Sequence, residues 1–394
     1  MPSRTPTTRE STLRRVGRDS RLRRAHVALA FTFVAFGTVD GTWSARLPAL
    51  KARLDLDSSR LGLVVFAVSG TATAVLPLAG WLAARFGSRG PAALGLVLMA
   101  GALSAAAFAP GVEELAVAAA AIGAGFGIVD VAANAHGVAL EGELGRHVLS
   151  ALHGMWSVGL LVGSAVAAAA AAAAVGVRGQ FPAVAAAVVV LALVAVPRLL
   201  PRADDAATAR FALPRGEVAL PALLMFCSMF VESAAMSWSA VFLAGPAHAG
   251  AAVAAGGVVA FSVAMALSRF AGDRLLGRWG VAGLARRGGA TSCAGMALAL
   301  AARTPAAGLA GFALVGIGCA AIVPALFRVA GSASGVAPAA GIAAVGTAGY
   351  TGAVVNGPAI GFLARGVGLT PALGLVAAAA LVIAALGPRL VSPR

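Results

Sequence analysis

Long apolar runs separated by short polar segments extend along the whole chain. A run of about 20 apolar residues is long enough to cross the hydrocarbon core of a bilayer as a helix. Helices satisfy their own backbone hydrogen bonds in lipid, where no water can do so. The runs are continuous and do not alternate residue by residue, as the strands of a transmembrane barrel would. The pattern therefore predicts an all-α membrane protein.

Twelve transmembrane helices are predicted, six on each side of a polar stretch at 199–215. They cover residues 26–47, 59–83, 91–110, 114–140, 149–175, 180–197, 217–243, 250–271, 288–303, 306–330, 338–363 and 368–387. The expected order along the chain is a disordered basic cytosolic tail at 1–25, a six-helix half at 26–198, a cytosolic linker at 199–215, a second six-helix half at 216–388 and a cytosolic tail at 389–394.

Composition excludes a sizeable water-soluble domain. Of the 394 residues, 60% are hydrophobic and 11% are charged, whereas about a quarter of the residues of soluble domains are charged. The three cysteines lie inside apolar runs and have no metal-ligand spacing, so we interpret them as small buried side chains. We expect no metal and no cofactor.

The net charge is +15. The distribution of the basic residues along the chain indicates the membrane topology and does not indicate a binding partner. With the N-terminus in the cytosol, 23 of the 30 basic residues fall on the cytosolic side. This asymmetry follows the positive-inside rule and predicts an even number of spans, with both termini in the cytosol. Because the arginines lie between apolar runs and form no separate basic domain, we do not expect nucleic-acid binding.

The two halves repeat several features in the same order. Trp43-Ser44-Ala45 in the first predicted helix corresponds to Trp238-Ser239-Ala240 in the seventh, and each triplet follows an acid, Asp40 or Glu232. Gly123-x-Gly125 in the fourth helix corresponds to Gly316-x-Gly318 in the tenth. Repeated halves around a midplane site are typical of secondary transporters.

The segment Gly80-Trp81-Leu82-Ala83-Ala84-Arg85-Phe86-Gly87-Ser88-Arg89 resembles the signature loop G-x-L-A-D-R-x-G-x-R of the major facilitator superfamily. Ala84 replaces its acid, while Gly272-Asp273-Arg274-Leu275 keeps an acid in the equivalent loop of the second half. The resemblance implies the two-half fold of that family and a cytosolic gate formed by Arg85, Arg89, Asp273 and Arg274.

A narrower resemblance is to the YbjJ-like branch of bacterial inner-membrane proteins. It is carried by 130–137 (DVAANAHG), 153–159 (HGMWSVG) and 232–240 (ESAAMSWSA), with Ser237 where that branch commonly has Asp. The resemblance implies a secondary transporter and names no substrate.

Ionisable side chains inside a membrane are costly and are functional candidates. Asp40 and Glu232 fall near the middle of their predicted helices, so they are candidates for proton coupling; the alternative is a hydrogen bond to a neighbouring helix. Asp130 and Asn134 share one helix face at i, i+4, and either transport or a structural bond would explain them. Arg46, Arg269 and Arg328 near helix ends are expected to snorkel to lipid headgroups.

Further polar and aromatic residues could line a substrate cavity. His153 and Trp156 share a face of the fifth predicted helix, where an interfacial belt is the alternative. The complete set of expected cavity residues is Asn134, Trp43, Trp238, His153, Trp156, Tyr350 and Asn356. Pro77, Pro324 and Pro358 are expected to bend their helices.

These features favour a secondary active transporter that moves a small organic solute across the bacterial inner membrane by alternating access, coupled to protons. We expect a monomer in the lipid bilayer whose partners are the solute and protons. Drug or metabolite efflux by proton antiport remains an alternative to uptake by symport. A sensor or a membrane-embedded enzyme is a remote one, and no phosphate-binding G-x-x-x-x-G-K-[ST] loop occurs.

Overall fold

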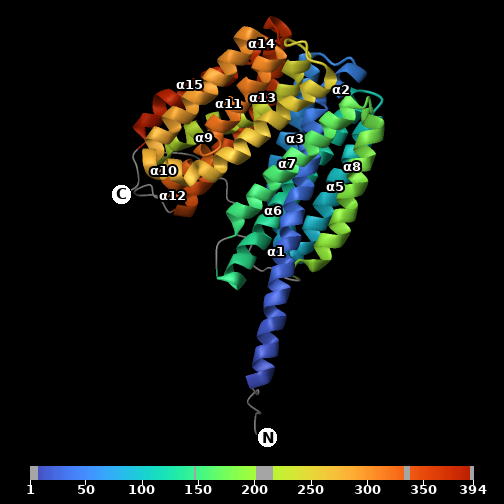
Figure 1. Ribbon diagram of the computed structural model, residues 1–394, viewed down its shortest axis with the longest axis vertical. Coiled ribbons are helices and arrows are strands. Elements are labelled where there is room, and N and C mark those ends of the chain that lie inside the picture. The colour runs from blue at the N-terminus through green and yellow to red at the C-terminus, as the bar shows by residue number, and fades with distance from the viewer. Residues whose placement is uncertain (1–7, 146–147, 201–215, 332–337, 391–394) are drawn as a thin grey trace.

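A computed structural model describes residues 8–145, 148–200, 216–331 and 338–390. The described chain is almost entirely helical and forms two bundles that lean together at one end and diverge toward the other (Figure 1). We call the first the closed end and the second the open end. The N-terminus extends from the open end.

The first bundle contains eight helices and a short 3-10 turn. They are α1 (Thr8–Ala45), α2 (Leu47–Arg53), α3 (Ser58–Ala74), α4 (Leu76–Phe86), α5 (Arg89–Phe108), α6 (Val112–Leu144), α7 (Leu149–Ala172), α8 (Val177–Ala195) and η1 (Val196–Arg198).

The second bundle begins after the linker. Its elements are η2 (Gly216–Val218), α9 (Ala219–Ala244), α10 (Ala251–Ala302), α11 (Pro305–Cys319), α12 (Ile322–Gly331), α13 (Pro338–Val367), α14 (Leu369–Ala372), α15 (Gly374–Leu386) and η3 (Gly387–Arg389).

The arrangement of these elements is consistent with the twelve predicted segments. Nine of the described helices are long and apolar enough to cross a membrane, or ten when α3 and α4 are taken together as one span bent by 41°. The bend lies at Val75, two residues before Pro77. Likewise, α11 and α12 are separate helices, and Pro324 lies in the first turn of α12. Pro358 lies inside α13. Two of the three expected proline sites therefore coincide with helix breaks.

Three local predictions differ from the structure. The chain is helical from Thr8, where a disordered tail over 1–25 was expected, because this stretch is rich in arginine and extends a helix that the first span has already nucleated. The short helix α2 was not predicted. The loop expected between the eighth and ninth helices, including Asp273, is helical within α10, which is interrupted only at Gly280 (φ 64°, ψ 176°). The side chain of Asp273 and residues 201–215 and 391–394 of the predicted linker and tail lie outside the described residues.

Glycines place equivalent helices in contact in both halves. A side chain at Gly123 would collide with the backbone of Val68 in α3, and one at Gly125 with Gly95 in α5. In the second half, Gly316 meets Phe261 in the first part of α10, and Gly318 meets Gly288 in its second part. Small residues allow such close approach of helices in lipid. The repeated glycine pairs thus pack α6 and α11 in the same way.

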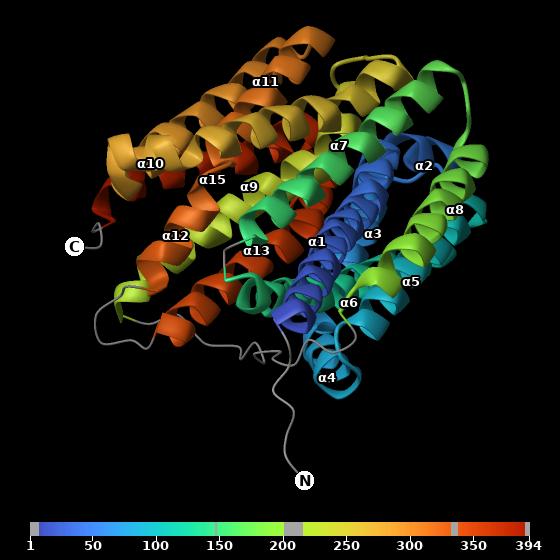
Figure 2. The ribbon, with the colours of Figure 1, turned by 60° about the horizontal axis from the view of Figure 1, so that its bottom comes forward.

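The closed end joins the two bundles. There α3 packs along α13, and α7 packs along α10. A methyl group at Gly62 would lie 2.5 Å from the carbonyl oxygen of Gly357. Ala167, Ala255 and Val258 form a small apolar cluster between α7 and α10. Toward the open end, α4 packs on α3, α5 and α6, whereas α12 packs on helices of the second bundle (Figure 2).

At the closed end of the first bundle, Arg46 and Arg53 form hydrogen bonds to backbone carbonyls of neighbouring segments. Arg46 donates to the carbonyl oxygen of Val175 at 2.6 Å and is buried, so the prediction that it snorkels to headgroups is wrong. Arg53 donates to the carbonyl oxygens of Ala106, Ala107 and Ala109, which follow or end α5. A guanidinium group at a helix C-terminus satisfies carbonyls that have no partner within the helix. Burial lowers the pKa of both Arg46 and Arg53.

Candidate functional site

A cavity of about 190 Å³ lies between the two bundles. Helices α1, α3, α6 and α7 of the first bundle and α9 and α13 of the second contribute its walls. Its lining residues are Asp40, Trp43, Ser44, Val65, Val68, Ser69, Ala72, Thr73, Phe126, Trp156, Met229, Glu232, Ser233, Met236, Ser237, Tyr350, Ala353 and Asn356. Six residues that the sequence singled out are thereby brought together, including both candidate coupling acids.

The matching Trp-Ser-Ala triplets have different roles. Trp43 lines the cavity, whereas Trp238 is fully buried in the hydrophobic core and does not line it. Helix geometry explains the difference. Trp43 is three residues after Asp40 and shares its face, whereas Trp238 is six residues after Glu232, about 240° around the helix. The prediction of Trp238 as a cavity residue is therefore wrong.

Glu232 pairs with Arg269, which was expected to reach the lipid headgroups. The Oε1 atom of Glu232 lies 3.5 Å from Nη2 of Arg269, and the Glu232 side chain is 8% exposed. The Nη1 atom of Arg269 donates to Oγ of Ser157 at 3.0 Å. Arg269 thus connects α9 and α10 with α7 of the other bundle, and its predicted snorkelling is wrong.

Asp130, Asn134 and His153 form a second polar group beside the cavity. The Nδ2 atom of Asn134 donates to Oδ1 of Asp130 at 2.9 Å, as their i, i+4 spacing allows. Oδ1 of Asn134 lies 2.9 Å from Nε2 of His153, so this nitrogen is the donor. The ring of His153 also lies 5.4 Å from that of Phe33. None of the three lines the cavity.

The cavity offers polar atoms that no described protein atom satisfies. Nε1 of Trp156 is a buried donor without a partner, and Oδ1 of Asn356 is a buried acceptor without one. The amide nitrogen of Asn356 donates to the carbonyl oxygen of Ala353, which fixes the orientation of the side chain. A buried polar group without a partner is costly, so these two atoms on lining residues are candidates for a bond to a ligand or to water.

The residues expected to form a cytosolic gate lie at the open end and are not joined across the bundles in the described part of the chain. The guanidinium group of Arg85 lies 6.0 Å from the ring centroid of its neighbour Phe86. Arg89 begins α5, and Arg274 is exposed on α10. Nearby, His136 bonds to Ser88 at 2.8 Å and accepts from the backbone N–H of Leu200, which ties the loop before α5 to the chain leaving η1.

The geometry fits binding better than bond-breaking chemistry. Within the described ranges, no three His, Cys, Asp or Glu side chains are grouped as a metal site would require. Ser157 donates to the backbone oxygen of His153 and accepts from Arg269, while the His153 ring bonds to Asn134. A nucleophilic serine needs a base on its hydroxyl, and this arrangement does not provide one.

A family sequence model and similar proteins indicate the same family for this chain. The sequence model of the family named Major Facilitator Superfamily matches residues 28–355 of this chain. An uncharacterized MFS-type transporter of Yersinia pestis is 31% identical over 91% of this chain and 93% of its own length. The membrane protein MosC of Rhizobium meliloti is 32% identical over 91% of this chain and 88% of its own length.

Solved structures of transporters share the fold. A D-xylose-proton symporter superposes with a TM-score of 0.76 at 14% identity, covering 94% of this chain and 98% of that one. The nucleoside transporter NupG gives a TM-score of 0.69 at 16% identity, covering 93% and 98%. The narrower resemblance to the YbjJ-like branch stays a prediction. The chain therefore belongs to the major facilitator superfamily of transporters and is a multi-pass protein of the bacterial inner membrane.

Proposed function

We propose that this protein is a proton-coupled carrier of a small neutral polar solute. The observation that carries the proposal is a cavity between the bundles lined by one carboxyl from each half, Asp40 and Glu232. The same cavity presents an unsatisfied donor on Trp156 and an unsatisfied acceptor on Asn356. A hydroxyl-bearing solute can satisfy both, since each hydroxyl donates and accepts.

The size of the cavity and the charge balance narrow the solute class. Drug-sized ligands occupy pockets of about 300–1,000 Å³, and this cavity measures about 190 Å³. Arg269 is already paired with Glu232, so the described lining offers no free cation for an anionic solute. A nucleoside transporter, a D-xylose-proton symporter and a fucose:proton symporter are among the proteins that share the fold, and their names support solutes with several hydroxyl groups.

Coupling is assigned to Asp40 and Glu232, with Asp130 in support. A carboxylate in the membrane is costly unless a cation or a proton neutralises it. Arg269 balances Glu232, and the described residues place no such cation on Asp40. We therefore assign the transported proton to Asp40. Glu232 responds through Arg269, which changes partners when the bundles move.

Alternating access follows from the packing of the bundles. With the termini in the cytosol, as the arginine distribution predicts, the structure is a state open toward the cytosol. Rocking about the cavity would separate Gly62 from Gly357 at the closed end. It would also bring Arg85 and Arg89 toward Asp273 and Arg274, the proposed gate of the opposite state. We propose that a monomer completes this cycle, since each chain holds a whole cavity.

Efflux of apolar compounds by proton antiport is the second candidate. Met229, Met236 and Phe126 also line the cavity, and flexible methionine side chains adapt to varied ligands. A thermal-shift screen of the purified protein separates the two functions. The panel contains pentoses, hexoses, polyols and nucleosides, with hydrophobic amines as comparators.

We expect the hydroxyl-bearing solutes to raise Tm and Asn356→Leu to remove that shift. Flux of the best solute into proteoliposomes under an imposed pH gradient then tests coupling. A shift by the amines alone, unaffected by Asn356→Leu, would favour efflux and contradict the proposal.

A further inference from the structure

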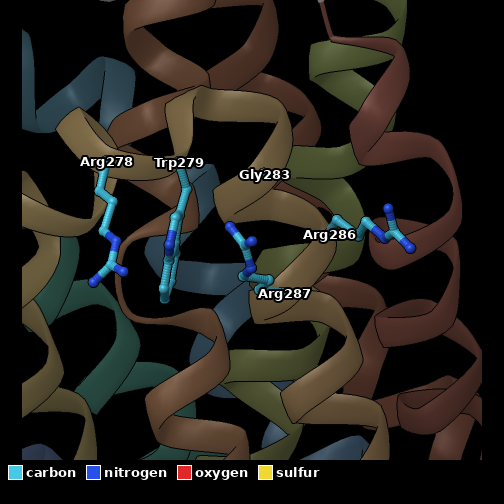
Figure 3. A pocket seen from close by; sticks show the side chains of 5 residues that line it. All are labelled: Arg278, Trp279, Gly283, Arg286 and Arg287. Carbon is cyan, nitrogen blue, oxygen red and sulfur yellow. The ribbon is translucent and has the colours of Figure 1, made fainter.

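A second hollow lies at the bend of α10, far along the chain from the residues of the central cavity. Helix α10 is interrupted at Gly280, where the backbone has a positive φ of 64° that glycine tolerates at little cost. The pocket at this bend measures about 610 Å³ and is lined by Arg278, Trp279, Gly283, Arg286 and Arg287. Figure 3 shows these five residues from close by.

An aromatic ring in this pocket contacts one arginine, and a second arginine lies on its other side in the view of Figure 3. In Figure 3 the ring of Trp279 lies between the guanidinium groups of Arg278 and Arg287, while Arg286 points away to the other side. The guanidinium carbon of Arg287 lies 4.4 Å from the centroid of the Trp279 ring. A cation over an indole face is attracted by the ring. The contact holds Arg287 in place while leaving its N–H groups free to bind.

The pocket carries positive charge that the described protein does not neutralise. Arg278, Arg286 and Arg287 are exposed, and in the described ranges no carboxylate pairs with them. The sequence from Arg274 to Arg303 contains no Asp or Glu. Gly387 of η3 packs against Ala285 and Arg286, so Arg389 adds a further positive charge to this side of the bundle. A ligand for the pocket is therefore an anion.

The pocket also lies at the level of lipid headgroups. The apolar span in the first part of α10 ends at Arg269, before the pocket begins. Trp279 is half-buried against an apolar cluster that includes Val281 and Leu284. A tryptophan with its body in the core and its edge in a polar zone is typical of the membrane interface. An anion reaching this pocket is thus within reach of the bilayer surface.

We propose that the pocket at the bend of α10 binds the headgroup of an anionic lipid, with its phosphate group on Arg287 and with Arg278 adding positive charge from the other side of the Trp279 ring. The planar guanidinium fork matches phosphate oxygens in pairs, and clusters of basic residues next to the membrane attract anionic headgroups. Trp279 contacts the glycerol or upper acyl region. The proposal is independent of the substrate and of proton coupling.

Native mass spectrometry of the purified full chain tests this site. The protein is incubated with equimolar phosphatidylglycerol and phosphatidylcholine of identical acyl chains, and the ratio of bound lipids is measured. Each basic residue near an anionic lipid contributes about fivefold to binding. The R278Q/R287Q variant should therefore lose the preference for phosphatidylglycerol by on the order of tenfold or more.

A matched control removes the same charge elsewhere. Arg60 and Arg365 are exposed at the closed end, and R60Q/R365Q should keep the wild-type preference. If R278Q/R287Q fails to fold, the single variants R278Q and R287Q are measured, and each should lose part of the preference. An R278K/R287K variant keeps the charge and should retain more binding than the glutamine pair.

Equilibrium dialysis with inorganic phosphate distinguishes the source of the phosphate group. Saturable phosphate binding that R278Q/R287Q abolishes, without a preference between the lipids, would support the site with a soluble ligand and overturn the lipid assignment. A lipid preference that both double variants lose equally, or that neither loses, would overturn the site itself.

Discussion

The two halves of the chain each place a carboxyl in the central cavity but surround it differently. In the first half, Asp40 on α1 faces the cavity beside Trp43, and no described cation contacts it. In the second half, Glu232 on α9 lies 3.5 Å from Arg269, which also bonds to Ser157 of the first half. The two halves thus differ: the Asp40 carboxyl has no described cation beside it, and the Glu232 carboxyl is already paired with Arg269.

The largest expected effect comes from Asp40→Asn. The amide cannot carry a transported proton, so accumulation of solute driven by a pH gradient should fall to background. Exchange of labelled for unlabelled solute needs no net proton movement and should continue. Flux in proteoliposomes, with the solute identified by thermal shift, measures both. Loss of exchange as well as accumulation would place Asp40 in solute binding instead.

Breaking the ion pair should have the next largest effect. Arg269→Gln leaves Glu232 buried without a counter-ion, and removal of one partner of a buried pair costs about 3–5 kcal/mol. Arg269 is 31% exposed, so the loss should lie at or below the lower end of this range.

The double variant E232Q/R269Q removes both charges and should regain much of the lost Tm. Thermal unfolding of the wild type, E232Q, R269Q and E232Q/R269Q forms a double-mutant cycle. Additive losses in the two single variants would argue against the pair.

The matching tryptophans should respond in opposite ways. Trp238 is fully buried, so Trp238→Phe leaves a void and should reduce stability by on the order of 1–2 kcal/mol, less than truncation to alanine. Trp43 lines the cavity, so Trp43→Phe should weaken solute binding with a change in stability of about 0.5 kcal/mol or less. Tm and solute affinity are measured for both. The same effect from both substitutions would mean that the halves use this residue alike.

The smallest effect is expected from Ser157→Ala. This substitution removes the hydrogen bond that Arg269 makes to α7, which is worth about 1 kcal/mol. Flux should change by about fivefold or less, and Ser164→Ala, whose hydroxyl bonds only within its own helix α7, serves as the control. Equal flux in both variants would remove Ser157 from the coupling network.

Much of the fold could be predicted from the sequence, because long apolar runs have few alternatives to helices in a membrane. The pair Asp130–Asn134 and the cavity residues Asp40, Trp43, Trp156, Glu232, Tyr350 and Asn356 also follow from position and spacing. The repeated glycines indicated equivalent helices, and the structure packs Gly125 and Gly318 on corresponding neighbours.

Other features depend on tertiary contacts that spacing along the chain does not reveal. Arg269 and Arg46 lie near helix ends, where reaching the headgroups and reaching a neighbouring helix are equally available to a long side chain. The Arg269 side chain reaches Glu232 and Ser157, and not the headgroups, because α10 crosses α7 and α9 in the folded protein. The assignment of Trp238 relied on a repeated triplet, although its spacing from Glu232 differs from the spacing of Trp43 from Asp40.

The most direct test of the different roles of Asp40 and Glu232 is a proton measurement. Proteoliposomes that contain a pH-sensitive dye are given a solute gradient without an imposed pH gradient. The wild-type protein should change the internal pH as solute moves, and Asp40→Asn should move solute without changing it. A change of internal pH in Asp40→Asn equal to that of the wild type would contradict the assignment of the transported proton to Asp40.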